Sequence, residues 1–157
     1  MNIHPDFEEL LRLLEEKNVD YMIVGGYAVA FHGHPRFTKD IDVFYLPSED
    51  NVVRLRAALL AFGFTEEELP VEAFRDSANV LTFGVAPSRV DLLSNIDGVN
   101  FYDAKNSVAR GRYGSVEVTF IGRDELIRNK QSTKRARDKA DVEELTQADD
   151  SPNDPSA

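Results

Sequence analysis

The sequence contains no cysteine, which removes several kinds of chemistry at once. Neither a disulfide, nor a thiolate metal site, nor a cysteine nucleophile is available to the chain. No apolar run reaches the roughly 18 residues that a membrane-spanning helix needs. The first six residues lack the basic and apolar regions of a signal peptide, so we expect a cytoplasmic protein that does not enter a membrane.

Basic residues are also scarce, since 18 Lys and Arg stand against 28 Asp and Glu and give a formal net charge of −10. Such a charge argues against a protein that coats nucleic acid along its whole surface. The basic residues are concentrated between Arg110 and Arg137, whereas the segment from Asp138 onward is strongly acidic. The basic segment could meet phosphates, or it could be solvated charge on a helix and a hairpin.

The chain has 157 residues, of which 42% are hydrophobic, enough for one globular domain with a real core. We expect this domain to span residues 1–146. Residues 147–157 are polar and acidic with two prolines, and they predict a disordered tail.

Hydrophobic periodicity predicts an α/β (α+β) fold, with a small mixed sheet flanked by helices. Residues 79–83 and 89–93 are expected to pair as antiparallel neighbours, and residues 100–114 to form a surface helix and a loop. The expected strands are 21–24, 41–46, 79–83, 89–93 and 115–121. The expected helices begin near residues 5, 25, 48 and 122, and the third of them ends at Gly63.

One stretch carries the candidate chemistry. The apolar run 21–24 ends at Gly25 and Gly26, and a second apolar run carries Asp40 and Asp42 one residue apart. Residues i and i+2 of a strand project from the same face, so the two carboxylates repel each other unless a cation lies between them. A hard divalent ion such as Mg²⁺ prefers these oxygens, and glycine lets backbone N–H groups approach a phosphate. The stretch therefore indicates a site for a metal-bound nucleotide.

This order of residues resembles the signature of the DNA polymerase beta-like nucleotidyltransferase superfamily. That signature is an apolar residue, Gly, then Gly or Ser, a spacer, and an Asp-apolar-Asp/Glu-apolar run. Here Gly26 stands where Ser is often found, and the spacer from Tyr27 to Lys39 is long. The segment from Arg36 to Asp42 is most similar to small bacterial and archaeal members, among them the toxin-type nucleotidyltransferases of abortive-infection systems.

A third acidic residue, Asp91, lies among apolar residues in the expected strand 89–93. A charge buried without a partner is expensive, which gives this aspartate a reason beyond packing. In the resembled superfamily such a strand supplies the third carboxylate. Asp97 and Asp103 lie in loop-like sequence and are expected to be turn residues. His32 and His34 flank a tight turn and are poorer ligands than oxygen for Mg²⁺.

The resemblance implies an enzyme that moves a nucleoside monophosphate from an NTP to an acceptor hydroxyl and releases pyrophosphate. Asp40 and Asp42 would bind two Mg²⁺ or Mn²⁺ ions, and Asp91 would share one of them. It also implies that an Arg/Asp set braces the two C-terminal helices.

Four further residues would bind the nucleotide on the same resemblance. Gly25 and Gly26 would seat the β- and γ-phosphates. Arg36 and Lys130 would offset the charge that builds on the leaving group.

Several alternatives stay open at the level of sequence. A glycosyltransferase also uses Asp-x-Asp, although without the diglycine, and a silent module of the same fold could bind a nucleotide, RNA or protein without turnover. The usual ATPase loop, Gly-x-x-x-x-Gly-Lys-Ser/Thr, is missing. The acceptor could be RNA such as tRNA, a protein hydroxyl or a small molecule, and a toxin would imply an antitoxin protein as partner.

Overall fold

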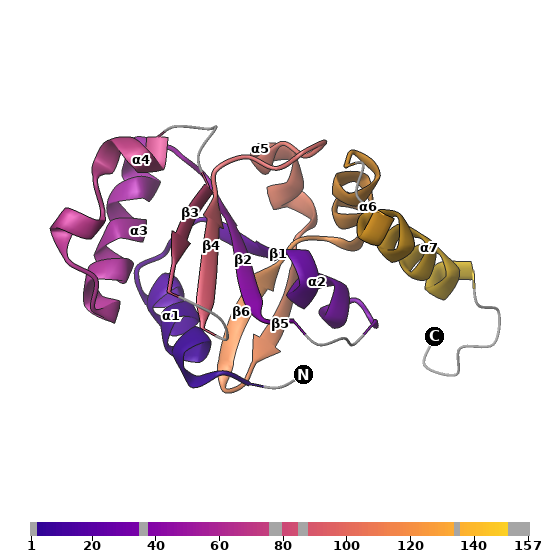
Figure 1. The fold of residues 1–157 in the computed structure, drawn as a ribbon, viewed down its shortest axis with the longest axis horizontal. Helices are drawn as coiled ribbons and strands as arrows, with labels where there is room; N and C mark the ends of the chain where they lie inside the picture. Colours follow the sequence, from indigo (N-terminus) through magenta and orange to yellow (C-terminus); the bar gives the residue numbers. More distant parts are fainter. Residues whose placement is uncertain (1–2, 35–37, 76–79, 85–87, 134–135, 151–157) are drawn as a thin grey trace.

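A six-stranded mixed sheet forms the centre of the computed structural model, which describes residues 3–34, 38–75, 80–84, 88–133 and 136–150 (Figure 1). The strand order is β3-β4-β2-β1-β6-β5. The strands are β1 (Tyr21–Val24), β2 (Asp40–Tyr45), β3 (Val80–Phe83), β4 (Arg89–Leu93), β5 (Ala109–Tyr113) and β6 (Val116–Phe120). The α-helices are α1 (Pro5–Glu16), α2 (Gly25–Phe31), α3 (Glu49–Phe62), α4 (Val71–Arg75), α5 (Phe101–Ala104), α6 (Arg123–Gln131) and α7 (Ala136–Asp150), with 3₁₀ turns η1 (Glu66–Glu68) and η2 (Lys105–Ser107).

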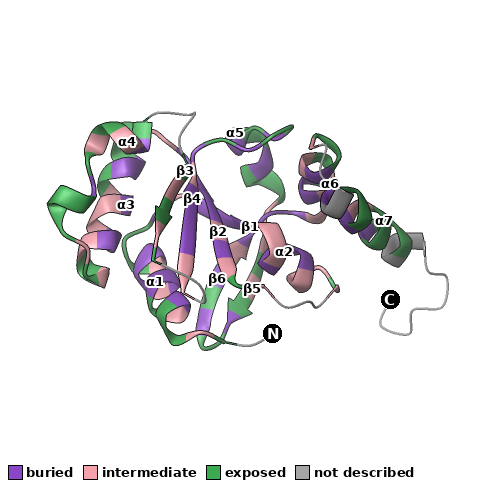
Figure 2. Ribbon diagram, viewed as in Figure 1, coloured by how far each residue is buried: buried purple, intermediate pink, exposed green. Residues whose placement is uncertain are grey.

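The middle of the sheet combines both kinds of strand pairing. Strand β1 runs antiparallel to β2 and parallel to β6, while β2 runs parallel to β4. All four residues of β1 are buried, as Figure 2 shows along its ribbon, because elements cover both of its faces. The predicted mixed sheet flanked by helices is therefore present, and the predicted antiparallel pairing of 80–83 with 89–93 is confirmed.

Helices α1 and α3 begin where the sequence predicts, and α3 ends at the predicted Gly63. The ring of His4 accepts a hydrogen bond from the Asp6 N–H at the start of α1, where Pro5 occupies the first turn. Ser48 caps α3 by accepting from the Asn51 N–H at 3.3 Å, and Gly63 ends it with a φ of 131°. Helices α1 and α3 pack on each other through buried leucines, and this packing fixes one side of the core.

Strand β5 was not predicted, because its sequence Ala-Arg-Gly-Arg-Tyr has too few apolar residues to alternate. It is an edge strand that forms a hairpin with β6 across a turn at Gly114. Gly111 is needed there because a Cβ atom would lie 2.4 Å from the ring of Phe31. That ring stacks on Phe120 with centroids 4.0 Å apart. Because residues 109–113 form a strand, the interpretation of 100–114 as a helix and a loop was wrong for its second half.

The C-terminal boundary also differs from the prediction. Helix α7 continues to Asp150, so residues 147–150 are helical instead of belonging to a disordered tail. Polar residues extend a helix readily when no proline interrupts them, and the first proline comes at Pro152. Residues 151–157 lie outside the described part of the chain. No helix among the described residues is long and apolar enough to cross a bilayer.

Candidate active site

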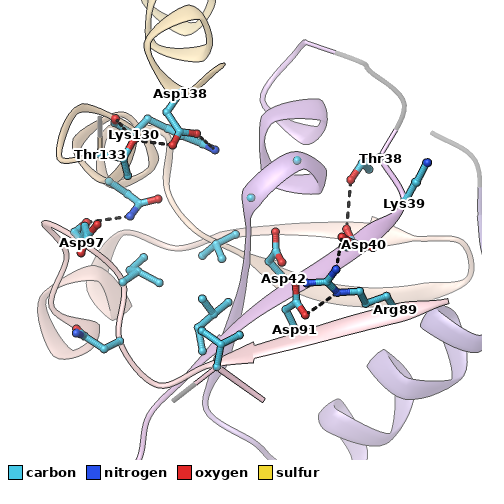
Figure 3. Close-up of a pocket in the computed structure, with 18 residues that line it drawn as sticks. Thr38, Lys39, Asp40, Asp42, Arg89, Asp91, Asp97, Lys130, Thr133 and Asp138 are labelled. Atoms are coloured by element: carbon cyan, nitrogen blue, oxygen red, sulfur yellow. Dashed lines mark hydrogen bonds and ion pairs between the residues drawn. The ribbon is translucent and has the colours of Figure 1, made fainter. Parts of the chain in front are cut away.

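The sheet register brings the predicted acidic residues together. Asp42 of β2 lies directly opposite Asp91 of β4, and Asp40 lies opposite Arg89. Because alternate residues of a strand share a face, all four side chains project from the same side of the sheet. They line a cleft of about 810 Å³ that Figure 3 shows in close-up.

The other walls of the cleft come from distant parts of the sequence. Gly25 and Gly26 approach from the end of β1, while Asn129 and Lys130 belong to α6. The further lining residues are Val24, Thr38, Lys39, Val80, Leu93, Asn95, Ile96, Asp97, Thr133 and Asp138. Asp97, which the sequence suggested was only a turn residue, thus borders the cleft. The exposed Asp103 lies in the first turn of α5 and does not.

Gly25 is the point of closest approach between backbone and carboxylate. Its φ is +68°, a left-handed conformation that residues with a side chain rarely adopt. A Cβ atom at this position would lie 2.1 Å from Oδ2 of Asp42. The glycine therefore leaves open the space that the Asp42 carboxylate occupies.

The carboxylates of Asp42 and Asp91 repel each other when both are ionised. Burial and the neighbouring carboxyl of Asp91 raise the pKa of Asp42 from 3.8 to about 7. The charge of Asp40 acts in the same direction, whereas Lys130 lowers this pKa. Such a site favours either a proton or a cation between the carboxyl groups.

The donor set suits a divalent ion in its chemistry, since the candidate ligands are all carboxylate oxygens. Their present arrangement is not a finished ligand set, however. Within the described part of the chain, no group of three or more His, Cys, Asp or Glu side chains is arranged to hold a metal ion. In Figure 3 the guanidinium of Arg89 lies against Asp91 and Asp40, where an ion would have to bind. Binding an ion requires these side chains to adjust.

Asp91 is the most firmly held of the three carboxylates. Thr82 of β3 donates its hydroxyl to Oδ1 at 2.8 Å, and Arg89 donates to both carboxylate oxygens. The sequence reasoning missed Arg89 and Thr82. Arg89 was detectable, because it stands two residues before Asp91 and therefore on the same face of the strand. Thr82 was not, because only the β3–β4 register places it beside Asp91.

Lys130 lines the cleft, but its ammonium group is engaged within the C-terminal helices. Its Nζ lies 2.8 Å from Asp138 Oδ1 and 3.4 Å from Asp141 Oδ2, and all three side chains are buried. The sequence suggested instead that Lys130 reaches the nucleotide phosphates. Its role in phosphate binding stays a prediction, and so does that of Arg36, which lies outside the described residues.

Replacing Lys130 with methionine is expected to destabilise the protein by about 3 kcal/mol, since breaking a buried ion pair removes the counter-charge of its carboxylates. Thermal or urea unfolding measures the effect. The exposed Lys139 of α7 offers the matched control, because Lys139→Met changes the net charge equally without touching this cluster. Equal stability of the two variants would contradict a structural role for the buried ion pair.

His32 and His34 lie apart from Asp40, Asp42 and Asp91. His32 Nε2 lies 2.8 Å from the carbonyl oxygen of Ile121, and His34 Nδ1 lies 3.8 Å from Glu144 of α7. Neither residue lines the cleft. The chain just after α2 thus contacts Ile121 through His32 and α7 through His34.

Known proteins resemble the chain in sequence and in structure. The model of the aminoglycoside-2''-adenylyltransferase family matches residues 6–102, well over half of the chain. A crystal structure of the lincosamide antibiotic adenylyltransferase LnuA with lincomycin bound is similar with a TM-score of 0.51 and 13% sequence identity. The likeness covers 93% of this chain and 98% of that one, and confirms the predicted nucleotidyltransferase fold. No curated protein matches the sequence.

The family match covers the diglycine and the three candidate metal ligands Asp40, Asp42 and Asp91, and it ends before α6. The predicted superfamily is therefore confirmed at the level of a nucleotidyltransferase. A closer relation to the toxin-type members stays a prediction.

Proposed function

The chain belongs to the aminoglycoside-2''-adenylyltransferase family of nucleotidyltransferases, and on that basis we propose that it transfers a nucleoside monophosphate, in a metal-dependent reaction, to a hydroxyl group of a small molecule. The donor is an NTP, and pyrophosphate leaves. The observation that carries the proposal is the register that sets Asp42 opposite Asp91 beside Gly25. A carboxylate pair next to an open backbone is the arrangement that a metal-bound triphosphate requires.

The three carboxylates share one task in this proposal. Asp40, Asp42 and Asp91 would hold the two Mg²⁺ or Mn²⁺ ions. Ions bound there supply positive charge to the triphosphate and lower the pKa of the acceptor hydroxyl. Thr82 and Arg89 fix Asp91 in orientation, while Asp42 is half-buried and its Oδ2 lies against Gly25.

The glycines and the cations of the cleft complete the donor site. Gly25 and Gly26 give the phosphates access to the backbone at the end of β1, and Lys39 lines the same cleft. Lys130 and Arg36 remain candidates for offsetting the charge on the departing pyrophosphate. For Lys130 this requires release from Asp138 and Asp141, or a contribution through its field alone.

The acceptor we favour is a small molecule that carries an amine, because the family is named for aminoglycosides and the similar LnuA is an adenylyltransferase of another class of small antibiotic. The acidic residues Asp97 and Asp138 line the cleft beyond the three aspartates. A net charge of −10 attracts cations and repels a polyanion such as tRNA. A toxin that modifies RNA or protein, with an antitoxin partner, is the outcome that would displace this proposal.

The test incubates the protein with α-labelled NTPs, Mg²⁺ and a panel of acceptors that contains aminoglycosides, a lincosamide, tRNA and cell extract. We expect label to enter a small molecule, with no transfer after a chelator is added. Asp91→Asn should lower the rate by at least about 100-fold. The exposed Asp103 is the matched control, and Asp103→Asn should retain full activity.

Three outcomes would count against the proposal. Label in tRNA or in a protein would point to the toxin-type reaction. Binding of NTP without release of pyrophosphate under any condition would indicate a silent module. Transfer that survives both chelation and the Asp91 substitution would exclude the metal-dependent site.

A further inference from the structure

Arg89 occupies the centre of the acidic cluster. Its Nε lies 3.1 Å from Asp91 Oδ1 and its Nη2 lies 3.2 Å from Asp91 Oδ2, so the contact is a two-pronged fork. Its Nη1 lies 3.8 Å from Asp40 Oδ2. In Figure 3 the guanidinium bridges the two strands on the side toward the cleft. A single positive charge thus serves two of the three candidate metal ligands.

This placement follows from the strand register and owes little to packing. Arg89 is opposite Asp40 in the parallel pair and two residues before Asp91 on its own strand. Its side chain is 44% exposed, so the guanidinium is not held by burial in the core. Since it is exposed and bound only at its charged end, it can withdraw toward solvent without disrupting the sheet.

Both oxygens of Asp91 are already in use in this arrangement. Oδ1 accepts from Thr82 and from Arg89, and Oδ2 accepts from Arg89. These three hydrogen bonds leave about one lone-pair site of the carboxylate, on Oδ2, where an ion would lie close to the guanidinium and be repelled by its charge. An ion that binds Asp40 meets the same positive charge nearby.

Resting on the function proposed above, we propose that Arg89 is a resident counter-cation, which competes with divalent ions for Asp91 and Asp40 and so sets the metal affinity of the site. The guanidinium holds the carboxylates together before the ion arrives. Arg89 would give up these contacts when an ion and its nucleotide supply positive charge to the same carboxylates. The consequence is a lower affinity of the site for a free divalent ion. The ion binds tightly only together with a triphosphate, whose negative charge favours it.

The test is a titration of the nucleotide-free protein with Mn²⁺ alone, followed by calorimetry or by electron paramagnetic resonance. Arg89→Met and Arg89→Gln remove the charge, and both are expected to bind Mn²⁺ about tenfold more tightly than the unmodified protein. Arg89→Lys keeps the positive charge but loses the two-pronged contact. Its affinity for Mn²⁺ should therefore lie between that of the unmodified protein and that of the two neutral variants. Circular dichroism establishes that each variant is folded.

Arg12 provides the matched control for net charge. It lies on α1, where it pairs with Glu8 and Glu9, and it does not line the cleft. Arg12→Met should leave the Mn²⁺ affinity unchanged. If it tightens binding as much as the Arg89 variants do, the effect is one of overall charge and the inference fails.

The outcomes separate this inference from the proposed function. If the unmodified protein binds Mn²⁺ and the folded Arg89→Met and Arg89→Gln variants bind it equally or more weakly, Arg89 does not compete and only the inference is overturned. Arg89→Lys binding as tightly as Arg89→Met would also overturn it, because charge would then not matter. If no protein of the series binds Mn²⁺ with or without NTP, the proposed metal-dependent function falls as well.

Discussion

Replacing Asp42 with asparagine is expected to abolish nucleotide transfer and, at the same time, to make the metal-free protein more stable above pH 7. The first effect follows from loss of a carboxylate between the diglycine and Asp91, and we expect a decrease of about 1,000-fold or more. The second follows from the raised pKa of this group. When the substitution of a functional side chain makes a protein more stable, that side chain is kept for function at a cost in stability.

The sign of the pH dependence can be worked out from the pKa. The carboxyl of Asp42 has a pKa of about 7 in the folded protein against 3.8 as its ordinary value. Between those values the folded state binds the proton more than the unfolded state does, so stability falls as the pH rises through this window. Above pH 7 the free-energy cost of holding Asp42 ionised in the folded protein is fully present, and below about pH 4 it is absent.

Asparagine removes this cost because it stays neutral at every pH and can still donate a hydrogen bond toward Asp91. Thermal unfolding in the presence of a chelator should show a gain of roughly 2 kcal/mol at pH 8, or about 5 °C in Tm. The gain should disappear near pH 4. Asp103→Asn, at an exposed position, is the control and should show neither effect. A variant less stable than the unmodified protein at pH 8 would mean that the pair is not strained.

The sequence predicted the three aspartates because their signal is local. Asp40 and Asp42 follow from the period of a single strand, and Asp91 is conspicuous as an acid inside an apolar run. For the three carboxylates to meet, β2 and β4 need only be neighbours in the sheet. Their parallel register then sets Asp42 against Asp91.

The remaining features depend on tertiary partners that no local pattern reveals. Lys130 looked free to reach phosphates, yet α7 packs on α6 and places Asp138 and Asp141 at its ammonium group. Thr82 contributes only through the β3–β4 register. Strand β5 was missed because an edge strand with a solvent-facing side carries few apolar residues. In each case, for Lys130, Thr82 and β5, the outcome depends on a partner from a distant part of the sequence, and the whole fold determines which partner that is.

Replacing Gly25 with alanine is expected to lower the transfer rate by about 100-fold or more while leaving the protein folded. The methyl group would occupy the position 2.1 Å from Oδ2 of Asp42, so the carboxylate must rotate away from the cleft. A misplacement of about 1 Å in a reacting group can cost roughly 100-fold in rate. The left-handed backbone at φ +68° adds a stability cost of about 1–2 kcal/mol.

The neighbouring glycine separates these causes. Gly26 is the second residue of α2 and does not have a left-handed backbone, and the resembled superfamily often has Ser at this position. Gly26→Ser should therefore keep activity within a few fold. Steady-state kinetics and thermal unfolding of both variants provide the measurement. If Gly25→Ala turned over as fast as the unmodified protein, the Asp42 carboxylate would not need its present position, and its assignment as a metal ligand would be lost. A large loss in Gly25→Ala beside a small one in Gly26→Ser would instead tie the requirement for glycine to the space that Asp42 fills.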